Sequence, residues 1–177
     1  SEDVIADIVK NGRRGSLNAV IKATGRQGHV AYPEKSANPL PVLLDALAKL
    51  RAMKLDTGSP GFQPSNLEVT TIDVGNVAHN VIPASATAKF NIRFNPNHKG
   101  DELMDRIRQL IGSAADGVGI TLEMRVTGEA FYTQPGRLTD LIIASVKDET
   151  GRTPLLTTGG GTSDARYIKD VCPVAEL

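Results

Sequence analysis

The sequence predicts a mixed α/β fold whose main part is a ferredoxin-like α+β domain, in which two helices cover one face of a four-stranded antiparallel sheet. Between residues 15 and 128, stretches that alternate apolar and polar residues and stretches with helical spacing follow in the order β-α-β-β-α-β. Residues 129–177 form a shorter unit that is too small to fold alone. We therefore expect a domain at 15–128, a fragment of a second, α/β domain at 129–177, and a linker or the end of that second domain at 1–14.

The first half of the ferredoxin-like domain begins with a strand at residues 15–24, because Leu17, Ala19, Ile21 and Ala23 lie on one face at period 2. A helix should start at Asn38-Pro39, since asparagine is a good N-cap and proline is tolerated in the first turn. Apolar residues then recur at helical spacing up to about Leu55. The glycine, proline and serine residues of 57–65 predict a loop.

The second half repeats the pattern with two strands, a helix and a strand. Alternation predicts strands at residues 67–74 and 84–94, joined by a loop at 75–83. An amphipathic stretch predicts a helix over residues 101–115, and residues 120–127 predict the last strand.

The C-terminal unit should contain a helix at 136–150, a strand at 153–156, a glycine-rich loop at 157–166 and a strand at 171–177. The last of these is an apolar run in which Cys172 is expected to be a core residue. Natural termini are more often polar and frayed, and the chain also begins without methionine. We therefore expect the sequence to be an excerpt of a longer polypeptide.

The composition excludes several classes of protein. The chain has 20 basic and 20 acidic residues, whereas a general binder of nucleic acids or anionic membranes needs a basic excess. It lacks an apolar run long enough to span a membrane and a signal-peptide pattern. A single cysteine excludes an internal disulfide framework and favours a reducing compartment, so a cytoplasmic location is expected.

Few residues in the chain could bind a metal ion. The candidates are His29, His79, His98 and Cys172, and no two of them have the i, i+2 or i, i+4 spacing of a metal motif. We therefore expect no complete metal site here, and His98 is expected to be a solvated turn residue. A Ser163–His29–Asp164 triad could be drawn, but Ser163 lacks a nucleophile-elbow setting. His29 itself lies on a tight loop between glycines, where a side chain is placed to contact a ligand.

Other polar residues are typical of a site for carboxylates. Arg13 and Arg14 precede Ser16, and guanidinium groups bind carboxylates in a bidentate way, although a solvated charge pair is an equal alternative. Arg93 shares a strand face with Asn91 and Asn95, which is either solvated or a binding surface. The Asn80 amide precedes a rigid Val-Ile-Pro turn. The glycine-rich loop lacks the order of a phosphate-binding loop, but its backbone can approach a ligand closely.

Several motifs together resemble one family. They are Arg13-Arg14-Gly15-Ser16-Leu17, residues 25–33 with Asn38-Pro39, Asn80-Val81-Ile82-Pro83, residues 90–94 and residues 157–166. Each is weak alone, but five in this order resemble the bacterial desuccinylases of the two-zinc aminoacylase and carboxypeptidase family of metallopeptidases. The Arg-Arg-Gly-Ser and Gly-His-x-Ala-Tyr-Pro segments favour that branch over the acetylornithine deacetylases and glutamate carboxypeptidases.

The resemblance implies a lid domain at 15–128 that forms a homodimer, and hydrolysis of N-succinyl-L,L-diaminopimelate to succinate and diaminopimelate. It implies that His29 reaches into the partner's active site and stabilises the developing oxyanion. Positions implied to surround the substrate carboxylates are Arg13, Ser16, Tyr32, Asn80, Arg93, Gly161, Thr162 and Ser163.

The resemblance also implies two zinc (or cobalt) ions, a bridging water and a glutamate base, all held by residues that flank this stretch, so this chain alone should bind no metal and be inactive. His79 departs from the asparagine expected in some relatives. Two alternatives remain open: a non-catalytic module for dimerisation or carboxylate binding, and a related acetylornithine deacetylase or carboxypeptidase.

Overall fold

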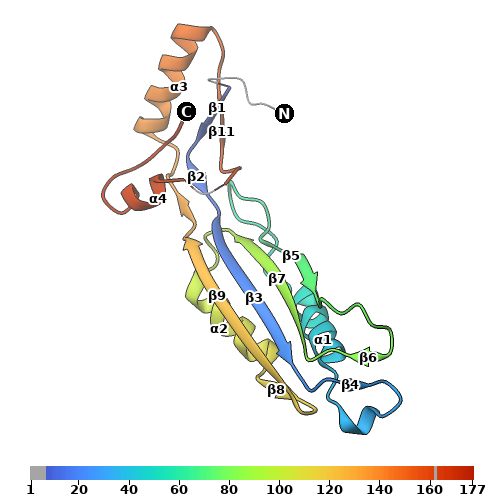
Figure 1. Cartoon of the computed structure of the whole chain (residues 1–177). Coiled ribbons are helices and arrows are strands. Elements are labelled where there is room, and N and C mark those ends of the chain that lie inside the picture. The colour runs from blue at the N-terminus through green and yellow to red at the C-terminus, as the bar shows by residue number, and fades with distance from the viewer. Residues whose placement is uncertain (1–6, 162) are drawn as a thin grey trace.

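An antiparallel sheet in the order β5-β7-β3-β9-β8 runs through the lower part of the molecule (Figure 1). Its strands are β3 (Gly15–Thr24), β5 (Asn66–Asp73), β7 (Ser85–Phe94), β9 (Val118–Gly128) and the short edge strand β8 (Ala114–Ala115). Strand β3 pairs with both β7 and β9, and β5 pairs with β7, all antiparallel. This is the ferredoxin-like strand order, so the predicted fold class is confirmed. The computed structural model describes residues 7–161 and 163–177.

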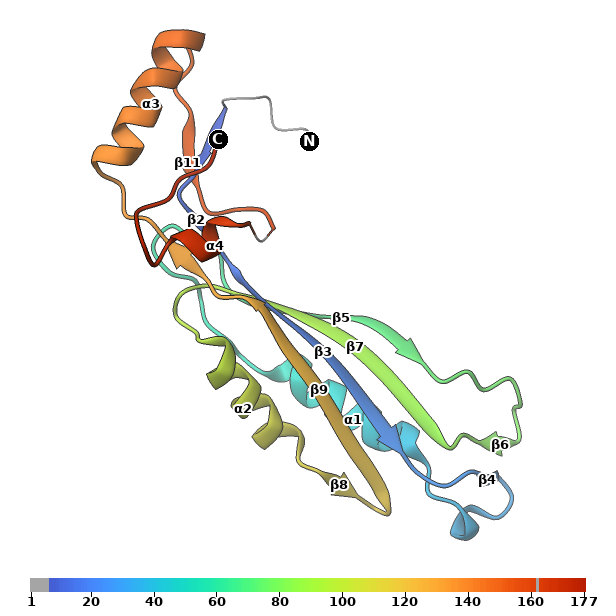
Figure 2. The ribbon, with the colours of Figure 1, turned by 60° about the vertical axis from the view of Figure 1, so that its left-hand side comes forward.

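Two helices, α1 (Pro39–Ala52) and α2 (Gly100–Ile111), lie on the same face of this sheet (Figure 2). The side chain of Asn38 accepts a hydrogen bond from the backbone N–H of Leu40, as an N-cap should. Helix α1 ends three residues earlier than predicted. Helix α2 stops at Gly112, whose φ of 72° no helix can continue, and the next residues form β8 instead of the predicted helix end.

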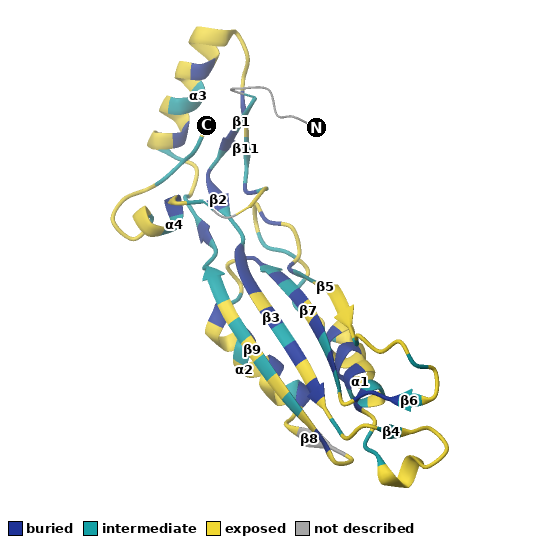
Figure 3. Ribbon diagram, in the orientation of Figure 1, coloured by how far each residue is buried: buried dark blue, intermediate teal, exposed yellow. Residues whose placement is uncertain are grey.

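The core fills the space between the sheet and the two helices. Its fully buried large side chains include Leu17, Ile21, Leu43, Leu50, Ile92, Phe94, Leu103 and Ile107. The strands alternate buried and exposed residues in Figure 3, because successive side chains of a strand point to opposite faces. The face away from the helices is polar, with exposed Asn18, Lys22, Lys89, Glu123 and Arg125.

The upper part of the molecule contains α3 (Arg137–Thr150), α4 (Ala165–Ile168) and two small ladders (Figure 1). Strand β1 (Ile8–Lys10) runs parallel to β11 (Leu155–Thr157), and β2 (Gly12–Arg13) pairs with β10 (Phe131–Tyr132). β2 continues into β3 along the chain, and β9 leads into β10, so two neighbouring strands connect the two parts. None of the helices in the described ranges is long and apolar enough to cross a bilayer.

The predicted strand at 171–177 does not form. Within the described ranges, one isolated bridge, between Lys10 and Glu176, pairs this segment. The chain after α4 continues as a turn in which the backbone N–H groups of Val171 and Cys172 donate to the carbonyl of Ile168. Pro173 has no N–H with which to extend a ladder. The prediction that Cys172 is a core residue is therefore wrong, since its side chain is exposed.

Candidate functional site

His29 lies at the tip of the molecule, in a small ladder that sequence patterns did not reveal. Strand β4 (Gly28–His29) pairs with β6 (Val81–Ile82), and His29 stands opposite Val81. The backbone N–H of Val30 also donates to the carbonyl of Asn80 at 3.1 Å. Gly25 makes the preceding turn possible, because a Cβ there would lie 2.0 Å from the carbonyl oxygen of Ala37. Two loops far apart in sequence are therefore tied together at the tip.

Both ring nitrogens of His29 have polar neighbours. Its Nδ1 accepts from the backbone N–H of Ala31 at 3.1 Å. The Asn80 side-chain amide is 3.4 Å from Nε2, and the Tyr32 ring centroid is 6.0 Å from that of His29. All three side chains are exposed. The structure thus gathers three of the predicted site residues into one exposed polar cluster.

Arg13 lies at the other end of β3, where the two parts of the molecule join. Its Nε and Nη2 donate to one carboxylate oxygen of Glu176 at 2.8 and 2.5 Å, and its Nη1 donates to the carbonyls of Gly159 and Gly161. The hydroxyl of Ser163 accepts from the N–H of Ala165 at the start of α4. Arg13 therefore contacts the glycine-rich loop, which contains Gly161 and Ser163. Thr162 lies outside the described residues.

Glu176 is a member of this cluster that sequence patterns did not single out. Burial alone would raise the pKa of its carboxyl group, but hydrogen bonds from Ser163 and Arg13 and the charges of Arg13 and Lys10 lower that pKa. The carboxylate is therefore ionised at neutral pH and fixes the Arg13 guanidinium against the glycine-rich loop. Its contact with Arg13 spans most of the chain, so no local spacing could have indicated it.

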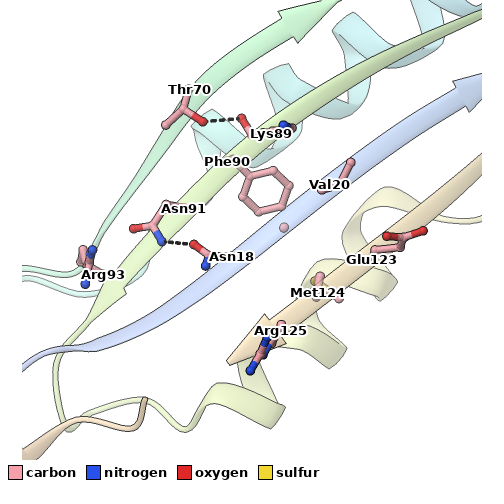
Figure 4. A pocket seen from close by; sticks show the side chains of 11 residues that line it. Asn18, Val20, Thr70, Lys89, Phe90, Asn91, Arg93, Glu123, Met124 and Arg125 are labelled. Atoms are coloured by element: carbon pink, nitrogen blue, oxygen red, sulfur yellow. Dashed lines mark hydrogen bonds between the residues drawn. The ribbon is translucent and has the colours of Figure 1, made fainter. Parts of the chain in front are cut away.

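Between the two ends, the open face of the sheet carries Ser16, Asn91 and Arg93. Asn91 donates through Nδ2 to the hydroxyl of Ser16, the carbonyl of Leu17 and the amide oxygen of Asn18, at 3.2, 3.1 and 2.7 Å. A hollow of about 840 Å³ lies over this face (Figure 4). Its lining residues are Asn18, Ala19, Val20, Thr70, Lys89, Phe90, Asn91, Arg93, Glu123, Met124 and Arg125. Arg93 thus lines an open polar surface, whereas Ser16 is buried beneath its neighbours.

The predicted residues do not form one site within a single chain. The His29 cluster and the Arg13 cluster lie at opposite ends of β3, whose ten residues span about 33 Å. Among the described residues, no group of three or more His, Cys, Asp or Glu side chains is placed to hold a metal ion. Asn95, expected on the face of Arg93, is fully buried, because β7 ends one residue before it.

Asn95 belongs to a second buried network that centres on Asp56. This carboxylate accepts hydrogen bonds from the N–H groups of Gly58 and Ser65 and from the Asn95 amide, and it pairs with His98 Nε2 at 2.9 Å. The prediction that His98 is a solvated turn residue is therefore wrong. Burial alone would raise the pKa of Asp56, but hydrogen bonds from Ser65, Gly58 and Asn95 hold it well below its usual value.

Replacing Asp56 by Asn in the full-length protein should lower the free energy of unfolding at pH 7 by about 2–3 kcal/mol, because the buried donors around it lose their charged acceptor. The pKa of Asp56 is lower in the folded state than in the unfolded state. Its stabilisation is therefore complete above about pH 4 and is lost as the pH falls through the folded-state pKa. Urea unfolding between pH 7 and pH 2 should show that the free energies of unfolding of the parent protein and of Asp56→Asn become equal in acid. Asp105→Asn, in an exposed pair with Arg108, is the matched control with almost no expected change.

The Asp56 network holds a loop that we call the strap, residues 57–65, which reaches from the sheet domain to the upper part of the molecule. Phe62 of the strap is buried and packs edge-on against Tyr132, with 5.4 Å between the ring centroids. Thr158 donates its hydroxyl hydrogen to the carbonyl of Gly61 at 2.5 Å. The strap is therefore a contact between the two parts besides the two strand connections.

The family model of the peptidase dimerisation domain matches residues 11–118, and the chain belongs to this family. Over its whole length it is 59% identical to a protein of Caulobacter sp. (strain K31), and over 99% of its length it is 59% identical to one of Maricaulis maris. Both relatives are called succinyl-diaminopimelate desuccinylase, which confirms the resemblance seen in the sequence. The chain covers 46% and 45% of them, so it spans less than half of their length.

Solved structures show the same fold at low sequence identity. Aminopeptidase PepT from Bacillus cereus matches with a TM-score of 0.74 and 18% identity, over 93% of this chain and 43% of that one. A tripeptidase from Staphylococcus aureus matches with a TM-score of 0.74 and 12% identity, over 96% of this chain and 44% of that one. Both likenesses concern the fold, and in both the chain again corresponds to less than half of the matched protein.

Proposed function

We propose that the full-length protein is a metal-dependent amide hydrolase of the cytoplasm that converts N-succinyl-L,L-diaminopimelate to succinate and L,L-diaminopimelate. The observation that carries this proposal is the 59% identity, over the whole chain, to proteins that bear the name of this desuccinylase. In this proposal residues 15–128 are a dimerisation lid, and residues 1–14 and 129–177 belong to a catalytic domain.

The proposed dimer gives the exposed tip a role. An imidazole that is exposed beyond the far end of a strand of about 33 Å cannot serve a site at the other end of that strand. In a homodimer, the lid of one subunit would present His29 Nε2 to the scissile amide of the other. There it would donate a hydrogen bond to the carbonyl oxygen as negative charge develops.

The remaining predicted residues would bind the charged ends of the substrate. We propose that Arg13, with Gly161, Thr162 and Ser163 of the glycine-rich loop, and Arg93, with Ser16, surround carboxylates from one subunit. Tyr32 and Asn80 would approach with His29 from the other subunit. Guanidinium groups suit this task because they bind carboxylates in a bidentate way. The described residues do not fit a metal pair, so the proposed zinc (or cobalt) ions would be held by residues outside this stretch.

Assays of the full-length protein with two substrates test this function. We expect faster hydrolysis of N-succinyl-L,L-diaminopimelate than of N-acetylornithine, loss of activity on dialysis against a chelator, and recovery with zinc. Faster hydrolysis of N-acetylornithine would identify a related deacetylase instead. Inactivity towards both substrates in the zinc-loaded protein would favour a non-catalytic module for dimerisation or carboxylate binding.

A further inference from the structure

We propose that a small pocket between the strap and the glycine-rich loop is a binding site for a short carboxylate anion, held by Arg14. The pocket has a volume of about 170 Å³, and it is lined by Arg14, Gly61, Gln63, Leu156, Thr157, Thr158 and Gly159. It is separate from the hollow over the open face of the sheet, which Arg93 lines. The anion would therefore bind where the sheet domain meets the upper part of the molecule.

The charges around Arg14 favour an anion. Its Nη1 donates to the amide oxygen of Asn66 at 2.9 Å, which is a neutral partner. Asn66 stands directly opposite Arg93 in the ladder of β5 and β7, so two guanidinium groups come from adjacent positions. Burial lowers the pKa of Arg14, and the charge of Arg93 lowers it further. Across the described part of the chain, no carboxylate is within ion-pair distance of either arginine, in contrast to Arg13 with Glu176.

The shape and chemistry of the pocket favour a small carboxylate. A guanidinium presents paired N–H groups at the spacing of a carboxylate, and the Thr157 hydroxyl and the Gln63 amide add groups that can donate to its oxygens. The hydroxyl hydrogen of Thr158 is already donated to the carbonyl of Gly61. A water occupies about 30 Å³ in the liquid, so the pocket has room for about five or six waters. That volume suits a carboxylate on a short carbon chain and excludes a nucleotide or a peptide. The inference does not depend on the proposed function, although succinate, the proposed product, belongs to this class.

Calorimetric titration of acetate and succinate into the full-length, metal-free protein at constant ionic strength tests the site. Arg14→Gln should weaken the binding by at least about tenfold, because the bidentate donor is removed. Arg14→Lys keeps the charge but not the paired donors, so it should retain only part of the affinity. Arg51→Gln, which removes an exposed guanidinium at the end of α1, should bind acetate and succinate with the affinity of the parent protein. Thermal unfolding of each variant checks that it is folded.

The position of the anion separates this site from the proposed substrate site at Arg13. Crystals soaked in acetate or succinate should show difference density for the carboxylate beside Arg14 and Gln63. Density only beside Arg13, unchanged affinity in Arg14→Gln, tighter binding of inorganic phosphate than of either carboxylate, or no binding by the parent protein would each overturn the proposal. None of these readouts is enzymatic activity, so the desuccinylase function can fail without this site failing, and the reverse also holds.

Discussion

Replacing His29 with alanine in the full-length protein is expected to lower kcat by about 10²- to 10³-fold and to leave the zinc content unchanged, since the loss of one donor to a developing oxyanion costs this much. The side chain is exposed at the tip, so its removal should not disturb the core. Steady-state kinetics and metal analysis of the purified dimer measure both quantities. His79→Ala, in the neighbouring exposed loop, is the matched control with near-parental activity expected.

Mixed dimers show whether His29 acts on the partner subunit. Subunits with His29→Ala would be combined with subunits whose metal-binding residues have been replaced, so that neither homodimer is active. If His29 acts across the dimer, random mixing should recover roughly one quarter of the parental activity, since half of the dimers are mixed and each has one competent site. Failure to recover activity would place His29 in its own subunit's site. Loss of zinc from His29→Ala would instead make it a metal ligand.

The long elements of the fold could be predicted because their signals are local. The bounds of β3 agree residue for residue with the prediction, since strict alternation over ten positions admits one register. Helix α1 begins where Asn38 and Pro39 predict. The helix predicted over residues 101–115 ends at Ile111 in the structure. The prediction ran too far because Ala114 and Ala115 suit a helix as well as a strand, and only the backbone of Gly112 breaks the helix before them.

The arrangement of the candidate site could be predicted only in part. Residue types indicated that Arg13, His29 and Asn80 bind polar ligands, and the structure does bring His29 and Asn80 together. The reason they meet is the pairing of β4 with β6, and two-residue strands carry no periodicity. Glu176 and Arg13 are separated by 163 positions, so no sequence window contains both. His98 was misassigned for the same reason, since its partner Asp56 lies 42 positions away.

Replacing Phe62 with alanine should lower the free energy of unfolding of the full-length protein by about 3 kcal/mol, because a buried aromatic side chain is lost. We also expect a fall in kcat of about tenfold or more, for a geometric reason. The strap holds the sheet domain against the upper part of the molecule, and His29 lies about 33 Å further along β3. A rotation of about 5° at the junction would move the tip by about 3 Å, and a misplacement of 1 Å can already cost about 10²-fold in rate.

A stability-matched variant separates this geometric effect from simple destabilisation. Leu47→Ala removes a buried side chain from α1, with an expected cost of about 2–5 kcal/mol, but it leaves the strap and the junction in place. At a temperature where both variants are fully folded, Leu47→Ala should keep near-parental kcat while Phe62→Ala does not. Equal activities in the two variants would mean that the strap contributes stability alone. A selective loss in Phe62→Ala would mean that the contact of Phe62 with Tyr132 sets the angle at which the lid presents His29.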